Sequence, residues 1–170
     1  MNINTLVLSG GSTSCISYIG IFNYLFENNI LAKDLHNVTH IVTTSAGILY
    51  SFFLILRLNI ETILTLLDSL HFEDYVQCEK IHINNIINDF GIFTNKLDIL
   101  VQSILKETIQ QPNITLQEFY DLYKVKLTVK VCNVTKRTTD FINYETDPDI
   151  QLTTLVTMTT SIPIIFKPIK

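Results

Sequence analysis

Ser45 stands at the junction of two apolar runs, where its hydroxyl can serve as a nucleophile. The residues before it, His40-Ile-Val-Thr-Thr, are apolar or β-branched, and Ala46-Gly47 opens a long apolar run after it. This pattern predicts a strand that turns sharply into a helix at the serine. Such a turn exposes the hydroxyl beside the positive end of a helix, as in the G-x-S-x-G nucleophiles of hydrolases. Ser45 is therefore the candidate nucleophile.

The stretch Gly10-Gly11-Ser12-Thr13 is the second cluster with a possible chemical role. It ends a short apolar run, a pattern typical of a buried strand followed by a tight loop. From Ser17 onward the apolar residues recur at helical spacing, so the loop precedes a helix. The backbone N–H groups at the start of a helix lack intrahelical partners. The loop is either a plain turn or an anion site. Nucleotide binding is disfavoured because the chain has neither a Walker lysine nor a G-x-G-x-x-G motif.

The composition limits the classes of function. The 170 residues are 47% hydrophobic with a mean hydropathy of +0.30, which predicts one folded domain rather than two, and no disorder. The net charge is −4 and the 12 Lys and Arg residues are scattered, so we expect no nucleic-acid partner and no basic patch for anionic lipid. The three cysteines, Cys15, Cys78 and Cys132, lack metal-ligand spacing, so no metal site is expected.

Two features predict a cytoplasmic protein without a transmembrane segment. The N-terminal MNINTLVLSGG lacks the basic and apolar regions of a signal peptide, and an odd number of cysteines suits a reducing compartment. The longest apolar run, residues 48–56, is closed by Arg57 and is far shorter than the roughly 20 residues that cross a bilayer.

The first sixty residues alternate between strand and helix patterns. Such an order is typical of a parallel sheet covered by helices, with right-handed connections. The sequence therefore predicts a single α/β domain in which Ser45 faces the backbone N–H groups near Gly11. The predicted strands are 5–10 and 38–44, and the predicted helices begin at 17 and span 46–58.

The rest of the chain carries helix and strand signals and one weakly assigned segment. Thr115 with Glu118 forms a capping box that predicts a helix start, and residues 125–134 alternate like a strand. Residues 150–162 suit either a β-branched helix or a strand. Residues 72–89 are mixed and suit a lid or an insertion. Further predictions are an antiparallel partner strand at 138–144 and helices at 60–70 and 95–108.

The segments LVLSGGSTSCISYIGIFNYL, VTTSAGIL and LTTLVTMTTSIPIIFKPI follow one another in an order that resembles patatin-like phospholipases. The first of them resembles the first strand, glycine-rich loop and helix of that family, with a match at Gly20. VTTSAGIL resembles its nucleophile turn. Together with a later segment the matches frame nearly the whole chain, which is expected to be one patatin-like domain over 1–170. That later segment, LTTLVTMTTSIPIIFKPI, carries the family's spacing of Ser161, Pro163, Phe166 and Pro168.

The resemblance implies a three-layer α/β/α fold with a mainly parallel central sheet. It also implies a serine acyl hydrolase in which Ser45 is the nucleophile of a Ser-Asp dyad without histidine. No cofactor or metal takes part, and the substrates are phospholipid or neutral-lipid esters met at a membrane surface. The backbone N–H groups of the oxyanion hole would come from Gly10, Gly11, Ser12 and Thr13.

The sequence also departs from the family pattern. Thr43 stands at the first glycine of the nucleophile turn, and Ser14 stands at the Arg or Lys of the glycine-rich loop. Ser12 and Cys15 replace two glycines of that loop. The family's activating aspartate lies in a D-G-[GA] motif after the Ser-x-x-Pro segment, and the domain lacks this part. None of the downstream candidates is followed by glycine, namely Asp140, Asp147 and Asp149.

The lack of this aspartate leaves two hypotheses open. In the first, the chain is an acyl hydrolase, and the aspartate comes from a missing C-terminal part or from a second chain. In the alternative, the chain is a catalytically inactive remnant of the family that binds lipid or a partner. A Ser-Asp-His triad is disfavoured because none of the four histidines follows Cys132.

Three features have structural interpretations beside the chemical ones. Ser45 also suits the N-cap of a helix that starts close to a sheet. Residues 48–58 suit the core as well as the wall of an acyl-chain tunnel. Cys15 is better interpreted as a small packed thiol than as a second nucleophile, because no basic residue lies close to it in the sequence.

Overall fold

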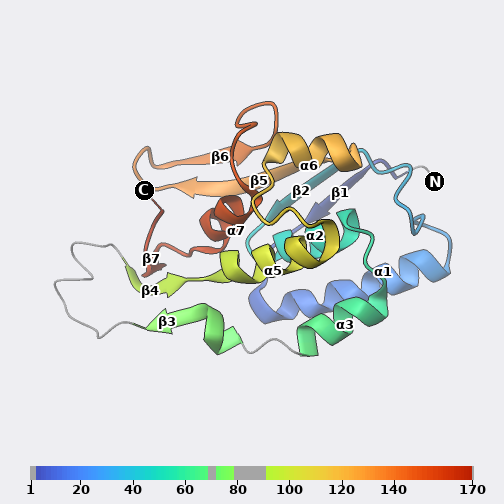
Figure 1. Ribbon diagram of the computed structural model, residues 1–170, viewed down its shortest axis with the longest axis horizontal. Helices are drawn as coiled ribbons and strands as arrows, with labels where there is room; N and C mark the ends of the chain where they lie inside the picture. Colours follow the sequence, from blue (N-terminus) through green and yellow to red (C-terminus); the bar gives the residue numbers. More distant parts are fainter. Residues whose placement is uncertain (1–2, 69–71, 79–90, 170) are drawn as a thin grey trace.

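The central element of the structure is a four-stranded sheet. The computed structural model describes residues 3–68, 72–78 and 91–169 (Figure 1). In the sheet order β1-β2-β5-β6, the first three strands are parallel and β6 is antiparallel to β5. The predicted α/β fold with a mainly parallel central sheet is thereby confirmed. The strands are β1 (Thr5–Leu8), β2 (His40–Thr44), β5 (Lys126–Asn133) and β6 (Thr138–Ile142).

The register of the sheet places the ends of β1 and β2 at the same edge. Leu8 pairs with Thr43, and Thr43 pairs with Val129 of β5. Because the strands are parallel, the loop at Gly10 and the turn at Ser45 leave the sheet beside each other. Open parallel sheets bind ligands at the carboxyl ends of their strands. Strand pairing alone therefore brings the two sequence clusters together at the edge where a ligand is expected.

Helices follow the strands as the sequence predicts. The capping box at Thr115 is confirmed, because its hydroxyl accepts from the N–H of Glu118 while the Glu118 carboxylate accepts from the N–H of Thr115. Residues 152–160 form a helix whose buried side chains pack on α5 and β5. The helices are α1 (Ser17–Glu27), α2 (Gly47–Ile55), α3 (Ile60–Asp68), α5 (Leu97–Ile109), α6 (Leu116–Tyr123) and α7 (Leu152–Thr160), with a 3₁₀ turn η1 (Ser12–Ile16) before α1.

A second, smaller sheet has the order β3-β4-β7, in which β3 is antiparallel and β7 is parallel to β4. Gly91 allows the close approach of β7, since an added Cβ would lie 2.3 Å from the carbonyl carbon of Phe166. The segment assigned to a lid or an insertion lies partly outside the described residues, at 79–90. The elements are a 3₁₀ turn η2 (Phe72–Tyr75), β3 (Val76–Cys78), β4 (Gly91–Asn95) and β7 (Ile164–Phe166).

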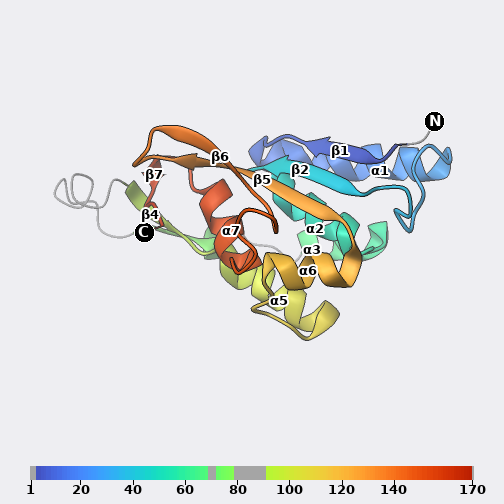
Figure 2. The ribbon, with the colours of Figure 1, turned by 90° about the horizontal axis from the view of Figure 1, so that it is seen from above.

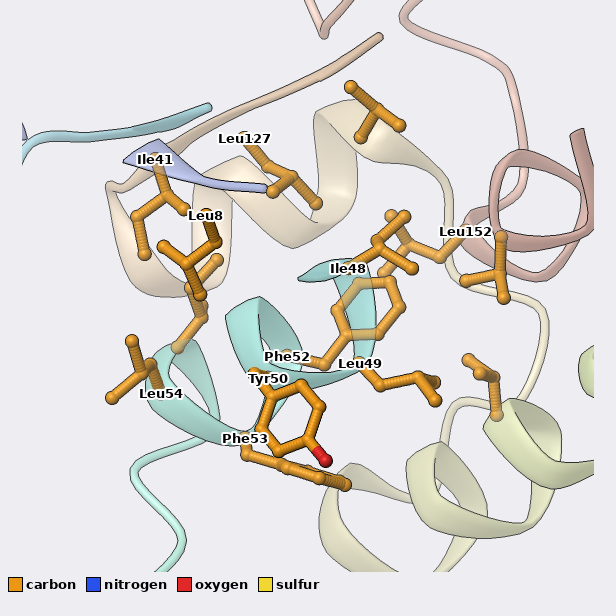
Figure 3. Close-up of a cluster of buried hydrophobic side chains, with 14 of the residues drawn as sticks. Leu8, Ile41, Ile48, Leu49, Tyr50, Phe52, Phe53, Leu54, Leu127 and Leu152 are labelled. Atoms are coloured by element: carbon orange, nitrogen blue, oxygen red, sulfur yellow. The ribbon is translucent and has the colours of Figure 1, made fainter. Parts of the chain in front are cut away.

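The core is centred on α2, whose nine residues are all buried (Figure 3). A helix that is apolar on every side is buried on every side. Leu8, Ile41 and Leu127 of the sheet belong to the same buried cluster. Phe52 contacts Phe119 of α6 edge to face, with ring centroids 5.9 Å apart. The interpretation of this apolar run as core is therefore confirmed.

The two faces of the sheet differ in exposure. Ile41, Thr43 and Val129 are buried, whereas Val7 is 74% and Phe141 54% exposed. Figure 2 shows α2, α3, α5, α6 and α7 together on one side of the strands. Because β1, β2 and β5 follow one another across the sheet in chain order, right-handed connections place their helices on one face. The described elements thus supply the sheet and the helical layer on that face.

Replacing Thr43 by valine is expected to raise the free energy of unfolding by about 1 kcal/mol. The Thr43 hydroxyl is buried and has no hydrogen-bond partner among the described residues. The hydroxyl has room because residue 47 is a glycine. A Cβ at position 47 would lie only 2.9 Å from Thr43 Oγ1. Valine keeps the β-branched shape and removes the desolvated hydroxyl. Urea-induced unfolding measures the change.

Thr160→Val is the matched control for this substitution. The Thr160 hydroxyl donates to the carbonyl oxygen of Val156 and accepts from Asn95 Nδ2, both at 2.7 Å. Its loss leaves the buried amide of Asn95 poorly paired, so the free energy of unfolding should fall by about 1–3 kcal/mol. A stabilising effect of Thr160→Val, or a destabilising one of Thr43→Val, would contradict this assignment of paired and unpaired hydroxyls.

Candidate active site

Ser45 occupies the sharp turn between β2 and α2. Its φ angle is 52°, in the left-handed region that non-glycine residues rarely adopt. β2 ends at Thr44, and α2 begins at Gly47 with Ala46 as its N-cap residue. The predicted passage from strand to helix at the serine is therefore confirmed, and the backbone has the strained conformation that places a side chain outside both elements.

Thr159 of α7 holds this turn in place. The N–H of Ser45 donates to Thr159 Oγ1 at 2.8 Å, and that hydroxyl donates to the carbonyl oxygen of Lys130 at 2.8 Å. One side chain thus joins the turn to β5 and α7. The carbonyl oxygen of Ser45 accepts from the N–H of Ile48 at 3.0 Å, which makes it part of the first turn of α2. These bonds offset the strain of the left-handed residue.

Two glycines leave the space that the turn needs. A Cβ added to Gly10 would lie 2.7 Å from Ser45 Cβ and 3.3 Å from Ser45 Oγ. A Cβ added to Gly47 would lie 2.7 Å from the carbonyl oxygen of Leu8 and 2.8 Å from that of Ser9. The backbone of the first loop therefore lies directly against the serine side chain, which is half-buried. The structure brings the two predicted clusters together.

The loop after Gly10 leads into η1 and presents backbone N–H groups to solvent. Gly11, Ser12 and Thr13 are exposed, and Ser12 has a φ angle of 51°. Residues at the start of a helix have no intrahelical acceptor for their N–H groups. Going along the loop from Gly11, the first N–H group in a backbone hydrogen bond is that of Ser14, which donates to the carbonyl oxygen of Gly11 at 3.0 Å. The loop thus combines contact with Ser45 and free donors.

Two side chains fix the peptide unit between Ser9 and Gly10. Tyr18 Oη donates to the carbonyl oxygen of Ser9 at 3.1 Å, and Cys15 Sγ donates to the same oxygen at 3.7 Å. This oxygen and the N–H of Gly10 belong to one planar unit and point in opposite directions. The contacts on the oxygen therefore set the direction of the Gly10 N–H.

The thiol of Cys15 is a packing group. Its side chain is buried in the core cluster, and burial raises the pKa of the Cys15 thiol above its usual value. A protonated thiol is a poor nucleophile. The interpretation of Cys15 as a small packed residue is therefore confirmed.

Among the described residues, no acidic or basic side chain forms a hydrogen bond with Ser45 Oγ. The carboxylate of Asp140 accepts from Asn133 Nδ2 at 2.7 Å and from Thr138 Oγ1 at 3.0 Å. These bonds hold the pKa of Asp140 below its usual range. Asp140 therefore serves the hairpin between β5 and β6.

Asp147 and Asp149 lie at the opposite edge of the sheet from Ser45. Because β6 is antiparallel to β5, the chain after Ile142 continues toward the edge where β5 begins, and there Glu145 contacts Lys126, the first residue of β5. There the N–H of Asp147 donates to the carbonyl oxygen of Asn143 at 2.9 Å. An extended strand the length of β2 separates this edge from Ser45 by about 13 Å. Neither aspartate is placed to activate the serine.

The two histidines that the structure describes, His36 and His40, are also not placed to form a triad with Ser45. His40 begins β2 at the far edge, and its Nε2 lies 2.9 Å from Thr128 Oγ1. His36 Nδ1 lies 2.7 Å from the carboxylate of Asp34 on the surface. His71 and His82 fall outside the described residues. No group of three His, Cys, Asp or Glu side chains within the described ranges is arranged to hold a metal ion.

Sequence analysis did not single out Thr159 or Tyr18. Thr159 lies two residues before Ser161 in the segment that resembles the family, yet its contact with Ser45 spans 114 residues. Tyr18 reads as one of several aromatic residues on a helix. No local pattern distinguishes either residue, because each acts through a contact that exists only in the folded chain.

A family model described as patatin-like phospholipase matches residues 6–170 of the chain. Among similar proteins is Probable lipid hydrolase 463L of Invertebrate iridescent virus 6, which is 28% identical over 171 residues. The match covers 98% of this chain and 56% of the viral protein. The chain thus spans little more than half the length of that relative.

Solved structures with the same fold include proteins of Legionella pneumophila and Pseudomonas aeruginosa. VipD from Legionella pneumophila matches with a TM-score of 0.64 at 18% identity, covering 98% of this chain and 43% of VipD. The type III effector protein ExoU matches with a TM-score of 0.62 at 12% identity, covering 94% of this chain and 40% of ExoU. ExoU in complex with SpcU from Pseudomonas aeruginosa gives 0.62 at 16% identity, with 95% and 39% covered. At these identities the likeness concerns the fold.

Gly10→Ala is expected to lower the free energy of unfolding by about 1–3 kcal/mol, because the new methyl overlaps the side chain of Ser45. Gly20→Ala in α1 is the matched control, since an added Cβ there has nothing within 4 Å. It should raise stability by up to about 1 kcal/mol through helix propensity. Thermal unfolding compares the two variants. Equal stability of both would show that the first loop does not press against Ser45.

Proposed function

The chain belongs to the patatin-like phospholipase family, and on that premise we propose that it hydrolyses ester bonds of phospholipids or neutral lipids with Ser45 as nucleophile. One observation carries the proposal: Ser45 sits in a left-handed turn directly against the Gly10 backbone, beside exposed N–H donors. The name of the viral relative, a lipid hydrolase, supports the same reaction class.

In this mechanism Ser45 Oγ attacks the ester carbonyl and gives up its proton to a base. The carbonyl oxygen becomes an oxyanion, which the N–H groups of residues 10–13 stabilise by hydrogen bonds. The C–O bond to the alcohol then breaks, the alcohol takes the proton, and an acyl-enzyme remains on Ser45. Water attacks the acyl-enzyme, releases the fatty acid and restores the hydroxyl. Loss of one oxyanion donor costs roughly 3 kcal/mol in the barrier.

The base in this proposal is a carboxylate outside these 170 residues. In the described part of the chain no carboxylate contacts Ser45 Oγ, and Asp140 is already bonded to Asn133 and Thr138. A serine hydroxyl without a base is a weak nucleophile at neutral pH. We propose that the aspartate comes from further polypeptide or from a second chain that docks beside Ser45.

The second candidate function is binding of lipid or a partner without hydrolysis. It is favoured by the same observation, the lack of an acidic or basic partner for Ser45 Oγ among the described residues. In that case the turn and the loop keep their shape for structural reasons. Labelling of Ser45 by an active-site probe separates the two candidates.

The proposed place of action is a membrane surface reached from the cytoplasm. Among the described helices none combines the length and apolar character needed to span a bilayer. In this proposal a lipid ester reaches Ser45 at the protein surface, where the first loop is exposed. No nucleic acid, cofactor or metal takes part in the proposed reaction.

Ser45→Ala is expected to abolish labelling by a fluorophosphonate probe and any ester hydrolysis, with a loss of at least about 10³-fold. Ser103→Ala on α5 is the control, because its exposed hydroxyl bonds only the carbonyl oxygen of Ile99 within its own helix. Mass spectrometry of the labelled peptide locates the adduct. A well-folded protein that is not labelled at Ser45 even together with the polypeptide that supplies the aspartate would support the binding function instead.

Tyr18→Phe is expected to lower the rate of this labelling about tenfold, since the carbonyl oxygen of Ser9 loses a donor and the Gly10 N–H loses its fixed direction. Tyr24→Phe, on an exposed position of the same helix, is the matched control and should leave the rate unchanged. Equal rates for both variants and the parent would remove Tyr18 from the positioning of the loop.

A further inference from the structure

The hydroxyl of Thr159 supports Ser45 from a helix that lies 114 residues later in the chain. This hydroxyl donates its proton to the carbonyl oxygen of Lys130 at 2.8 Å. Because a hydroxyl has one proton and two lone pairs, its oxygen then accepts from the Ser45 N–H, also at 2.8 Å. Lys130 pairs with Thr44, the last residue of β2. The end of β5 therefore fixes the direction in which Thr159 holds the turn.

This hydrogen bond opposes the one local change that would move the serine side chain away from the first loop. The φ angle of 52° is unfavourable for any residue that carries a Cβ. Without the Thr159 hydroxyl the partly buried N–H of Ser45 would lose its acceptor, which folded proteins avoid. Both costs would be removed by rotation of Ser45 to an ordinary negative φ. That rotation would carry Oγ away from Gly10.

The end of α7, which carries Thr159, is held from the other side by Asn95 of β4. The Asn95 side chain is buried, and its Nδ2 donates to Thr160 Oγ1 at 2.7 Å and to Ser161 Oγ at 3.2 Å. Its Oδ1 accepts from the N–H of Leu97 at 3.1 Å, which anchors the amide at the start of α5. Figure 1 shows α7 between β5 and β4. Neighbouring side chains thus bond the last turn of α7 to both sheets.

We propose that Thr159 and Asn95 are positioning residues for the reaction of Ser45, Thr159 directly and Asn95 through the end of α7. The inference rests on the proposed function and adds to it a chain of hydrogen bonds from the second sheet to the nucleophile. Neither side chain contacts the ester in this proposal. Together they keep Ser45 Oγ against the Gly10 loop before the substrate arrives. A reacting group that is displaced slightly from its working position reacts much more slowly.

The first measurement is hydrogen exchange of the Ser45 amide, followed by NMR, which needs no second polypeptide. Thr159→Val removes the acceptor and keeps the branched shape, so this exchange should become at least about tenfold faster. Thr159→Ser keeps the hydroxyl and should restore slow exchange. Thr157→Val is the matched control, because this half-buried hydroxyl donates within α7 to the carbonyl oxygen of Thr153 at 3.1 Å. It should leave the Ser45 amide unchanged.

The second measurement is the rate of fluorophosphonate labelling of Ser45 in the presence of the polypeptide that supplies the aspartate. Thr159→Val should lower this rate by about tenfold or more, because Oγ leaves the loop. Thr159→Ser should restore the rate, and Thr157→Val should keep it. Thermal unfolding shows which variants are folded. If Thr159→Val does not fold, Thr159→Ala, which also lacks the hydroxyl, takes its place.

A double-mutant cycle tests the role of Asn95. Asn95→Ala alone should lower the labelling rate by about threefold or more. In the Thr159→Val background the same substitution should have little further effect, because its influence on Ser45 passes through Thr159. A purely structural weakening of the protein would instead add to the effect of Thr159→Val. Additive effects, or an unchanged rate in folded Asn95→Ala, would overturn the part of the inference that concerns Asn95.

The two measurements separate this inference from the proposed function. A parent that is labelled at Ser45 at the same rate as folded Thr159→Val would overturn the inference and leave the proposed hydrolysis standing. If the parent is never labelled, the proposed function fails and the exchange rates alone test the hold on the turn. Faster exchange at Ser45 in Thr159→Val would then support that hold, and unchanged exchange would overturn it.

Discussion

The turn at Ser45 exists because two glycines leave space around it. A serine with a φ angle of 52° forces β2, α2 and the first loop into close contact. Gly10 lies against the serine side chain, and Gly47 lies against the carbonyl oxygens of Leu8 and Ser9. A methyl group at either position would separate the loop from the turn. The contact between the candidate nucleophile and the candidate oxyanion donors is therefore a steric consequence of these two residues.

The departures from the family pattern are accommodated by local packing. Thr43 replaces a glycine, and its side chain points toward Gly47, where the missing Cβ gives it room. The first loop has lost glycines and a positive charge, yet Tyr18 and Cys15 bond the carbonyl oxygen of Ser9 and hold the backbone. Hydrogen bonds from neighbouring side chains thus maintain a geometry that conformational freedom alone would not define.

α7 connects the candidate site with the rest of the molecule. Its Thr159 bonds the turn at Ser45 and the backbone of β5, and its buried side chains pack against α5 and β5. The chain continues from α7 into β7, which pairs with β4. The conformation of the turn at Ser45 therefore depends on a segment more than a hundred residues later in the chain.

The sequence by itself determined the elements whose signals are local. Apolar periodicity predicted the β-α-β-α order, the capping box predicted the start of α6, and turn chemistry predicted Ser45 and the Gly10 loop. Residues 150–162 remained ambiguous because β-branched side chains suit both a helix and a strand. The packing of residues 152–160 on α5 and β5 decided for the helix. Only the tertiary structure decided the bonds of Thr159 and Tyr18, because contacts between distant residues leave no local pattern in the chain.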